Sequence, residues 1–389
     1  MALPANASQI NTSDTIADTI KTTAGYFTNG DGTIEGTSIF THSLADSNEK
    51  YYFNVCQTHP LTSSAEVQFS VTYGHFAGSG SNTYGDSNSN PNTLRGETQA
   101  VYNQLSQLLM EESEVSGGFK ISAGGSSGVH SAGTKDEYVY ALIGKRSKFK
   151  DRINKKAWTL VLDGIKTDNS EAFALHLTDD SSTIAPVATP GGPRYNIVSG
   201  TLGTVADSKT ASVRTYGWFY PEMGIMLFSG AELSASIPGM PISDASQSIF
   251  QVDTTRAATT AAYVRSSSLG FAPCNGATAN KFNALKLAMC MRYVGSSTTL
   301  RLRSEEDQTQ ENYFCRIKAP EYNFSSNPTF TSGSKNKIRN ADMHGNPQTF
   351  ITGVGLYNSA GQLLAIAKLS SPLKKNFASE ATIKVKLTY

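Results

Sequence analysis

The closing segment of the chain alternates strictly between apolar and polar side chains. Its apolar positions are Ile383, Val385, Leu387 and Tyr389, and the residues between them are Thr382, Lys384, Lys386 and Thr388. Successive side chains of a β-strand point to opposite faces, so the pattern predicts a strand with one buried face. Such a strand has to pair with a neighbour, in its own sheet or in another subunit.

Short apolar or alternating runs that are typical of β-strands recur through much of the sequence. Strands are predicted at residues 50–56, 66–73, 137–143, 157–163, 298–303, 312–318, 349–357 and 361–368. Charged residues make up only 17% of the chain, and the abundance of Gly, Ser, Thr and Asn suits short strands joined by many turns. We therefore expect a mainly β fold, β-sandwich-like, with α+β insertions.

Two segments have helical rather than strand periodicity. Within residues 95–112, four apolar residues fall at i, i+4, i+7 and i+8 and form one stripe: Val101, Leu105, Leu108 and Leu109. A second amphipathic helix is predicted over residues 279–292. Residues 216–228 contain two apolar runs that flank Pro-Glu-Met-Gly, which predicts a hairpin.

Composition along the chain suggests three parts. Residues 1–48 are polar and are expected to form an extended N-terminal arm with one short strand, ordered by partners. Residues 49–245 are expected to form a mixed β domain with one helix and a loop excursion near 178–212, where Thr, Pro and Gly are frequent. Residues 246–389 are expected to form a C-terminal β-rich domain.

Bulk charge argues against a nucleic-acid partner. The 33 basic and 32 acidic residues give a formal net charge of +1, whereas nucleic-acid binders usually have a basic face. One basic cluster lies between residues 145 and 156, and we interpret it as a solvated surface or a subunit contact. Its cations are Lys145, Arg146, Lys148, Lys150, Arg152, Lys155 and Lys156.

The N-terminal residues lack the basic and apolar regions of a signal peptide, and no apolar stretch approaches the ~20 residues that a membrane span requires. We therefore expect synthesis in the cytoplasm and no membrane span. The four cysteines contain no C-x-x-C pair and are expected to be free thiols.

No catalytic, metal or cofactor site is expected. Residues 124–128 match the G-x-S-x-G nucleophile elbow around Ser126, but they lack the preceding apolar strand and the following helix. The six histidines are scattered without metal-ligand spacing. Trp218 and Tyr220 could form a carbohydrate platform if exposed, although core packing is the favoured interpretation.

Several C-terminal segments resemble a family of virion structural proteins. The stretches are Tyr-Asn-Phe-Ser-Ser-Asn-Pro-Thr-Phe at 322–330, Thr-Gly-Val-Gly-Leu-Tyr-Asn at 352–358 and Leu-Leu-Ala-Ile-Ala-Lys-Leu-Ser-Ser-Pro-Leu-Lys-Lys at 363–375. The Gly-Ile-Met-Leu run at 224–227 looks similar as well. The family occurs in contractile-tailed phages, notably those of marine cyanobacteria, and the resemblance covers about half of the chain.

The resemblance implies a non-enzymatic structural subunit of a phage tail, most naturally in the baseplate, that acts through subunit–subunit assembly. The implied location is the virion, after synthesis in the host cytoplasm. The implied partners are other tail and baseplate proteins and copies of the chain itself, with contact to tail fibres as a further option. The alternatives are a receptor- or glycan-binding tail module and a neck- or capsid-associated virion protein.

Seven residues are candidates for the subunit interface. Phe324 and Phe330 would anchor a packed loop, the lysines would lie at a solvated rim or an interface, and the terminal strand would offer its last side chain. Ordinary intramolecular loop packing is the competing interpretation. The candidates are Tyr322, Phe324, Pro328, Phe330, Lys374, Lys375 and Tyr389.

Overall fold

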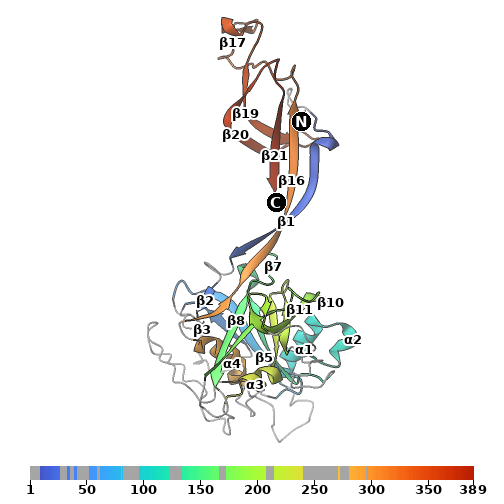
Figure 1. The fold of residues 1–389 in the computed structure, drawn as a ribbon, viewed down its shortest axis with the longest axis vertical. Helices are drawn as coiled ribbons and strands as arrows, with labels where there is room; N and C mark the ends of the chain where they lie inside the picture. Colours follow the sequence, from blue (N-terminus) through green and yellow to red (C-terminus); the bar gives the residue numbers. More distant parts are fainter. Residues whose placement is uncertain are drawn as a thin grey trace. The chain divides into compact units, whose positions relative to one another are not determined.

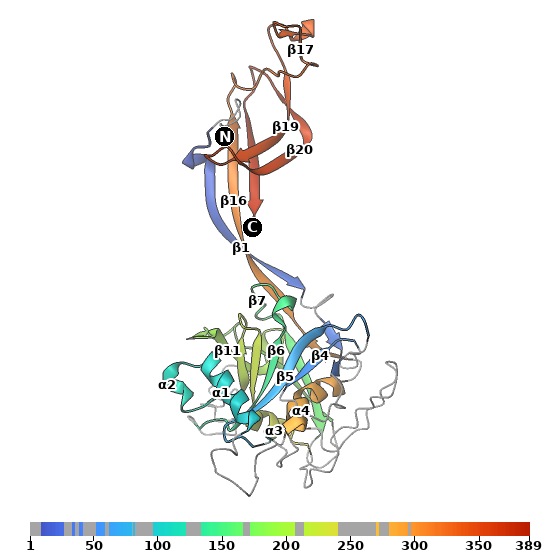
Figure 2. The ribbon, with the colours of Figure 1, turned by 180° about the vertical axis from the view of Figure 1, so that it is seen from behind.

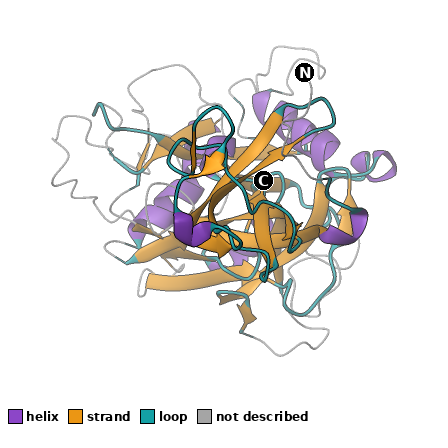
Figure 3. Cartoon of the chain, turned by 90° about the horizontal axis from the view of Figure 1, so that it is seen from above, coloured by secondary structure: helices purple, strands orange, loops and turns teal. Residues whose placement is uncertain are grey.

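A computed structural model describes residues 9–26, 33–35, 39–41, 52–58, 62–79, 81, 96–121, 134–165, 172–206, 214–239, 270–271, 280–294 and 297–389. Strands predominate and helices are few (Figure 3), so the predicted mainly β class is confirmed. The chain forms two compact units. Unit 1 consists of Met1–Thr23 and Asp307–Tyr389, and unit 2 consists of Ala24–Glu306.

Unit 2 is built on one large sheet with the strand order β2-β15-β8-β9-β11-β13-β14-β6-β5-β4-β3. Two short strands, β10 (Val187–Thr189) and β12 (Thr204–Val205), add to β11. The main strands are β2 (Thr33–Glu35), β3 (Phe40–Thr41), β4 (Tyr52–Cys56), β5 (Val67–His75), β6 (Tyr138–Gly144), β8 (Thr159–Ile165), β9 (Ala172–Asp179), β11 (Gly192–Thr201), β13 (Thr215–Tyr220), β14 (Ile225–Ser229) and β15 (Thr298–Arg301).

Both faces of this sheet are covered. In β6, Val139 and Ala141 pack in one cluster with helix α1 (Glu97–Leu109), whereas Tyr140 and Leu142 pack in another with helix α4 (Asn280–Tyr293). Figure 2 shows α1 and α4 beside β5 and β6, and the short helices α2 (Glu112–Val115) and α3 (Gly230–Ser236) nearby. Central strands with two buried faces explain the near-continuous apolar runs in this part of the sequence.

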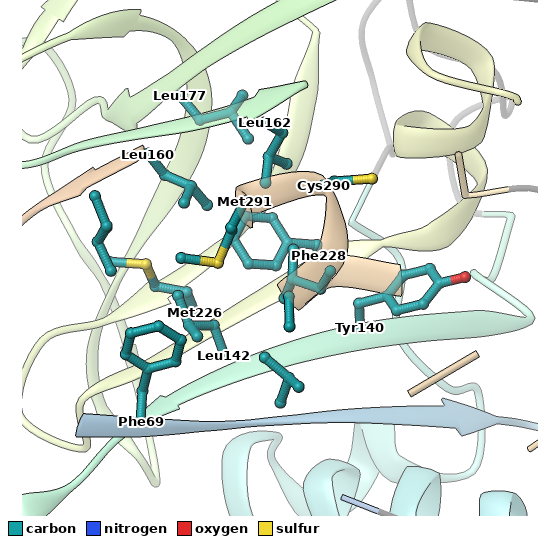
Figure 4. Packing of buried hydrophobic residues seen from close by; sticks show 14 of the residues in the cluster. Phe69, Tyr140, Leu142, Leu160, Leu162, Leu177, Met226, Phe228, Cys290 and Met291 are labelled. Atoms are coloured by element: carbon teal, nitrogen blue, oxygen red, sulfur yellow. The ribbon is translucent and has the colours of Figure 1, made fainter. Parts of the chain in front are cut away.

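Helix α4 lies inside the core rather than on its surface. Figure 4 shows Cys290 and Met291 of α4 among Leu160 and Leu162 of β8 and Phe228 of β14. Every residue from 283 to 292 is buried, including Lys286. The predicted helix is therefore present, but it has no solvent-exposed polar face over these residues, because the curled sheet surrounds it.

The predicted hairpin at residues 216–228 is confirmed as β13 and β14, with Gly224 at a φ of 68° in the turn. The predicted loop excursion near 178–212 is wrong for its described part. That part contains β11, a ten-residue strand that pairs with both β9 and β13. Buried Tyr195, Ile197 and Val198 supply the apolar contacts that override the turn-rich composition.

Unit 1 has two layers. One is formed by β1 (Thr15–Tyr26), β16 (Arg303–Ile317) and β21 (Ala381–Thr388), and the other by the hairpin of β19 (Thr349–Tyr357) and β20 (Leu363–Lys375), as Figure 1 shows. A small hydrophobic core lies between the layers, which makes this unit sandwich-like. The short strands β17 (Thr331–Ser332) and β18 (Lys337–Ile338) pair with each other.

The predicted terminal strand is confirmed as β21. It pairs antiparallel with β16 over eight positions, and Ile383 and Val385 are buried as the alternation predicts. The first residues of β16 belong to unit 2, where Ser304 and Glu305 pair with β7 (Arg152–Ile153). Among the described strands, β21 is an edge of its sheet.

The described N-terminal residues do not form a separate arm. β1 belongs to the sheet of β16 and β21, and Arg316 Nε lies 2.7 Å from Asp14 Oδ1. β2 and β3 belong to the sheet of unit 2. The division after Thr23 and Glu306 therefore differs from the predicted boundaries at 48 and 245, because strands distant in sequence pair with each other.

Candidate subunit interface

Four of the seven predicted interface residues meet at the open end of the β19–β20 hairpin. There Phe350 pairs with Lys374 and Thr349 pairs with Lys375. The Thr349 hydroxyl donates to the Tyr322 carbonyl oxygen at 2.5 Å, which ties the 322–330 loop to the hairpin. Tyr322, Phe324 and Lys374 are exposed there. This side-chain hydrogen bond to backbone joins residues that are 27 positions apart in the sequence.

Lys375 differs from its neighbour because it is fully buried. Its ammonium group donates to Ala319 O at 2.8 Å, to Asn323 Oδ1 at 2.9 Å and to Asn376 O at 2.9 Å. All three N–H groups of the side chain are used in this way. Lys375 therefore anchors the loop within unit 1 and presents no surface to a partner, which corrects the expectation of a rim or interface position.

Phe324 and Phe330 pack against each other within their loop. Their ring centroids lie 5.6 Å apart in an edge-to-face arrangement, a favoured aromatic geometry. Phe324 remains 54% exposed, and Phe330 is half-buried. Pro328 is exposed in the turn between them, where Phe330 N donates to Asn327 O at 2.8 Å. The pair fixes the loop internally and leaves one aromatic ring accessible.

Tyr389 lies at the other end of β21 from this loop. Its backbone exchanges hydrogen bonds of 2.8 and 3.0 Å with Thr309, and its side chain is 67% exposed. Eight strand residues separate it from Ala381, which corresponds to roughly 25 Å. Tyr389 and the loop around Phe324 are therefore not parts of one contiguous contact.

A larger exposed surface lies along the hairpin itself, and we call it the outer face. Its members are defined by the cross-strand pairs on the side of β19–β20 that points away from the core of unit 1. The paired members are Phe350, Gly353, Gly355, Tyr357, Leu363, Ile366, Lys368 and Lys374. Leu364, which lies at a register shift of the hairpin and is 66% exposed, is counted with them.

Over residues 364–367 the outer face of β20 carries larger apolar side chains than the inner face, whereas farther along the strand Leu369 and Leu373 pack inward. Ile366 is 71% exposed and Leu364 66% exposed, whereas the small Ala365 and Ala367 point toward the core. A strand that serves only its own core would place its large residues inward. In the sequence, this patch corresponds to the run Leu-Leu-Ala-Ile-Ala at 363–367. The run predicts a strand, but its pattern does not indicate which of its two faces is buried.

The core beneath the hairpin is small. Among the described residues, Ile317, Leu356, Ile383 and Val385 are the buried hydrophobics in the core cluster of unit 1, and the other described members are partly exposed. Small cores are marginal, because a small unit buries a low fraction of its surface. Additional apolar burial on the outer face would stabilise this unit.

The aromatic cluster at 218–220 is buried in unit 2. Trp218 is 6% exposed and Tyr220 is fully buried. The Arg194 guanidinium lies over the Trp218 ring, 3.9 Å from its centroid. Burial raises the pKa of Tyr220 to about 12, against the opposing effect of Arg194. These rings therefore pack in the core and form no exposed platform.

Three of the seven cations in the basic cluster at 145–156 pair with carboxylates. Lys148 pairs with Glu66, Lys150 with Glu306, and Arg152 with Glu305. Arg146 donates to the Phe149 carbonyl oxygen at 3.1 Å.

Within the described ranges, no group of three or more His, Cys, Asp or Glu side chains could hold a metal ion. None of the helices found there is long and apolar enough to cross a membrane. The G-x-S-x-G segment with Ser126 lies outside the described residues. Of the described cysteines, Cys56, Cys290 and Cys315 are free thiols.

Comparison with known proteins gave no match of any kind. No family model, no curated protein and no solved structure matches this chain.

Proposed function

We propose that this chain is a structural subunit that acts by assembling with other polypeptides through unit 1. The single observation that carries the proposal is the exposed apolar patch at the turn end of β20, where Leu364 and Ile366 point outward and Ala365 and Ala367 point inward. Exposed apolar patches of this kind mark interaction sites in soluble proteins. The small core of unit 1 supports the same conclusion, because contact with a neighbour would add the missing burial.

The proposed setting is the tail of a contractile-tailed phage, in the baseplate region. This part rests on the resemblance of residues 322–330, 352–358 and 363–375 to virion structural proteins. These residues fall in the loop and the hairpin that carry the candidate interface, so resemblance and exposed surface coincide. The proposed partners are other tail and baseplate proteins and copies of the chain, in a particle assembled in the host cytoplasm.

The receptor- or glycan-binding alternative loses its main support. That reading required Trp218 and Tyr220 in an exposed groove, and both are buried. An assembly role needs extended contact surfaces rather than a pocket, which agrees with the proposed absence of catalysis.

Cross-linking mass spectrometry of purified virus particles tests the proposal. A lysine-reactive reagent should join Lys368 or Lys374 to lysines of other tail proteins or of further copies. Links confined to capsid proteins would contradict the baseplate assignment, and absence of the chain from particles would contradict the structural role. Hydrolytic activity of the purified chain that is lost in Ser126→Ala would contradict the non-enzymatic assignment.

A further inference from the structure

Helix α1 of unit 2 has no capping side chain of its own, and a serine from outside the helix takes that place. The N-cap residue is Gly96, which has no side chain to accept a hydrogen bond from the helix. Instead, Ser81 Oγ accepts a hydrogen bond from Thr98 N at 3.0 Å. The first N–H groups of a helix need such acceptors, because they have no partner within the helix. The start of α1 therefore depends on the segment that holds Ser81.

Further hydrogen bonds join the first turn of α1 to the same segment, which follows β5. Thr98 Oγ1 donates to Ser79 O at 3.1 Å and shares a buried 2.6 Å hydrogen bond with Ser81 Oγ. Gln99 Nε2 donates to Phe76 O at 3.0 Å. Together with the cap, these bonds attach the start of the helix to the chain that leaves β5. Opening of this end of α1 therefore has to break contacts with that chain.

His75, the last residue of β5, holds this segment at its other end. Its Nδ1 atom accepts a hydrogen bond from Ala77 N at 3.1 Å, and its carbonyl oxygen accepts one from Gly78 N at 3.0 Å. The imidazole lies nearly parallel to the Tyr138 ring, with 6.1 Å between the centroids. A neutral imidazole can accept at Nδ1, whereas an imidazolium carries a hydrogen on both nitrogens and cannot. Protonation therefore removes the acceptor that Ala77 N uses.

The surroundings of His75 keep it neutral at neutral pH. Burial lowers the pKa of its imidazole, Glu137 opposes this effect, and Lys135 adds to it. Lys135 lies over the neighbouring Phe76 ring, 3.3 Å from the centroid. The other described side chains that are charged or can titrate, on the elements packed against β5, are Glu97 and Tyr102 of α1, Tyr52 and Cys56 of β4, Tyr138 and Tyr140 of β6, and Lys286, Cys290 and Arg292 of α4.

We propose that His75 is a pH-sensitive switch that controls whether the start of α1 stays capped. At neutral pH the neutral imidazole accepts from Ala77 N and keeps Ser81 in place at the helix. In mild acid the protonated ring cannot accept this hydrogen bond, so the turn after β5 opens and Thr98 N loses its acceptor. The switch lies in unit 2, and it adds a conformational response to the assembly role that is proposed for unit 1.

Hydrogen exchange of the full chain at about pH 7.5 and about pH 5.5, corrected for the intrinsic effect of pH on exchange, tests the proposal. Protonation of an ordinary histidine can make an opening that exposes it up to about tenfold more frequent at the lower pH, so amides at the start of α1 should exchange about three- to tenfold faster there. His75→Asn should show no such acceleration, because the amide oxygen of Asn can take the place of Nδ1 and does not titrate. His176→Asn is the matched control, since His176 is an exposed histidine of β9 in the same unit, and this variant should respond like wild type.

Ser81→Ala tests the link between the turn and the helix independently of His75. This variant lacks the cap, so the start of α1 should exchange faster already at the higher pH and gain less than about twofold in acid. The proposal is overturned if α1 of wild type exchanges equally at the two pH values, or if His75→Asn accelerates in acid as much as His176→Asn. An undiminished acceleration in Ser81→Ala would also contradict it. Thermal unfolding of each variant establishes that the substitutions leave the fold intact.

Discussion

The Lys375 ammonium group donates to Asn323 Oδ1 at 2.9 Å inside unit 1. This contact joins the last residue of β20 to the loop that carries the exposed Phe324, so the position of that aromatic ring depends on a buried cation. An exposed neighbour, Lys374, lies one residue away and points to the outer face. The two adjacent lysines therefore lie in different environments: Lys375 is buried inside unit 1, and Lys374 is exposed on its surface.

Replacement of Lys375 should be far more costly than replacement of Lys374. Lys375→Met removes three hydrogen bonds and leaves Asn323 Oδ1 without this donor, whereas the Ala319 oxygen keeps its 2.6 Å hydrogen bond from Asn323 Nδ2, so we expect a loss of about 1–3 kcal/mol in the stability of unit 1. Lys374→Met should change stability by less than about 0.5 kcal/mol. Hydrogen exchange of β19, β20 and β21 measures both variants, and equal protection in the two would refute this account of Lys375.

Gly224 should tolerate no side chain while Phe149 is present. The residue has a φ of 68°, and a Cβ would lie 2.6 Å from Phe149 Cε1. We expect Gly224→Ala to lower the unfolding free energy of unit 2 by about 2–4 kcal/mol, from backbone strain and overpacking together.

A double-mutant cycle separates those two causes. In a Phe149→Ala background, Gly224→Ala should cost only the backbone term of about 1 kcal/mol. Both tryptophans, Trp158 and Trp218, belong to unit 2, so their fluorescence during denaturation reports this unit alone. If the two substitutions lower the unfolding free energy additively, the Phe149 ring is not what excludes a side chain at position 224.

His75 should make unit 2 less stable in mild acid. Burial lowers the pKa of its imidazole below the ordinary 6.5, Glu137 partly offsets this, and Lys135 adds to it. Nδ1 also accepts a hydrogen bond from Ala77 N at 3.1 Å, which requires that nitrogen to be unprotonated.

The direction in which stability changes with pH follows from the lowered pKa of His75. The unfolded chain binds the proton more readily, so this stabilisation is complete above about pH 6.5 and is lost as the pH falls through the folded pKa. His75→Gln should remove a pH-dependent contribution below about 1 kcal/mol, measured by tryptophan fluorescence in denaturant at pH 7.5 and pH 5.5. An unchanged difference between the two pH values would contradict the assignment.

Local patterns in the sequence predicted the elements whose environment is simple. β21 buries Ile383 and Val385 as its alternation requires, and α1 buries Leu105 and Leu109 on one stripe. Each of these elements has one solvent-exposed face and one buried face, so the spacing of its apolar residues is enough to identify it.

Other features depend on pairing between distant segments, which local pattern does not encode. Thr and Gly around β11 predicted a loop, yet β9 and β13 provide partners for its backbone on both sides. The N-terminal β1 joins β16 and β21 although some 290 residues separate β1 from β16. For the candidate interface, sequence identified Phe324 and Lys374 but missed Ile366, because apolar alternation does not state which side faces the core.

Hydroxyl-radical footprinting of the outer face tests the central claim most directly. Side-chain labelling of Leu363, Leu364 and Ile366 would be compared between the dilute isolated chain and the assembled virus particle, with Tyr52 of unit 2, which is 57% exposed, as an internal reference. We predict that these three side chains are labelled readily in the isolated chain and strongly protected in the particle. Equal labelling in both states would contradict the claim that the outer face of β19–β20 is buried by assembly.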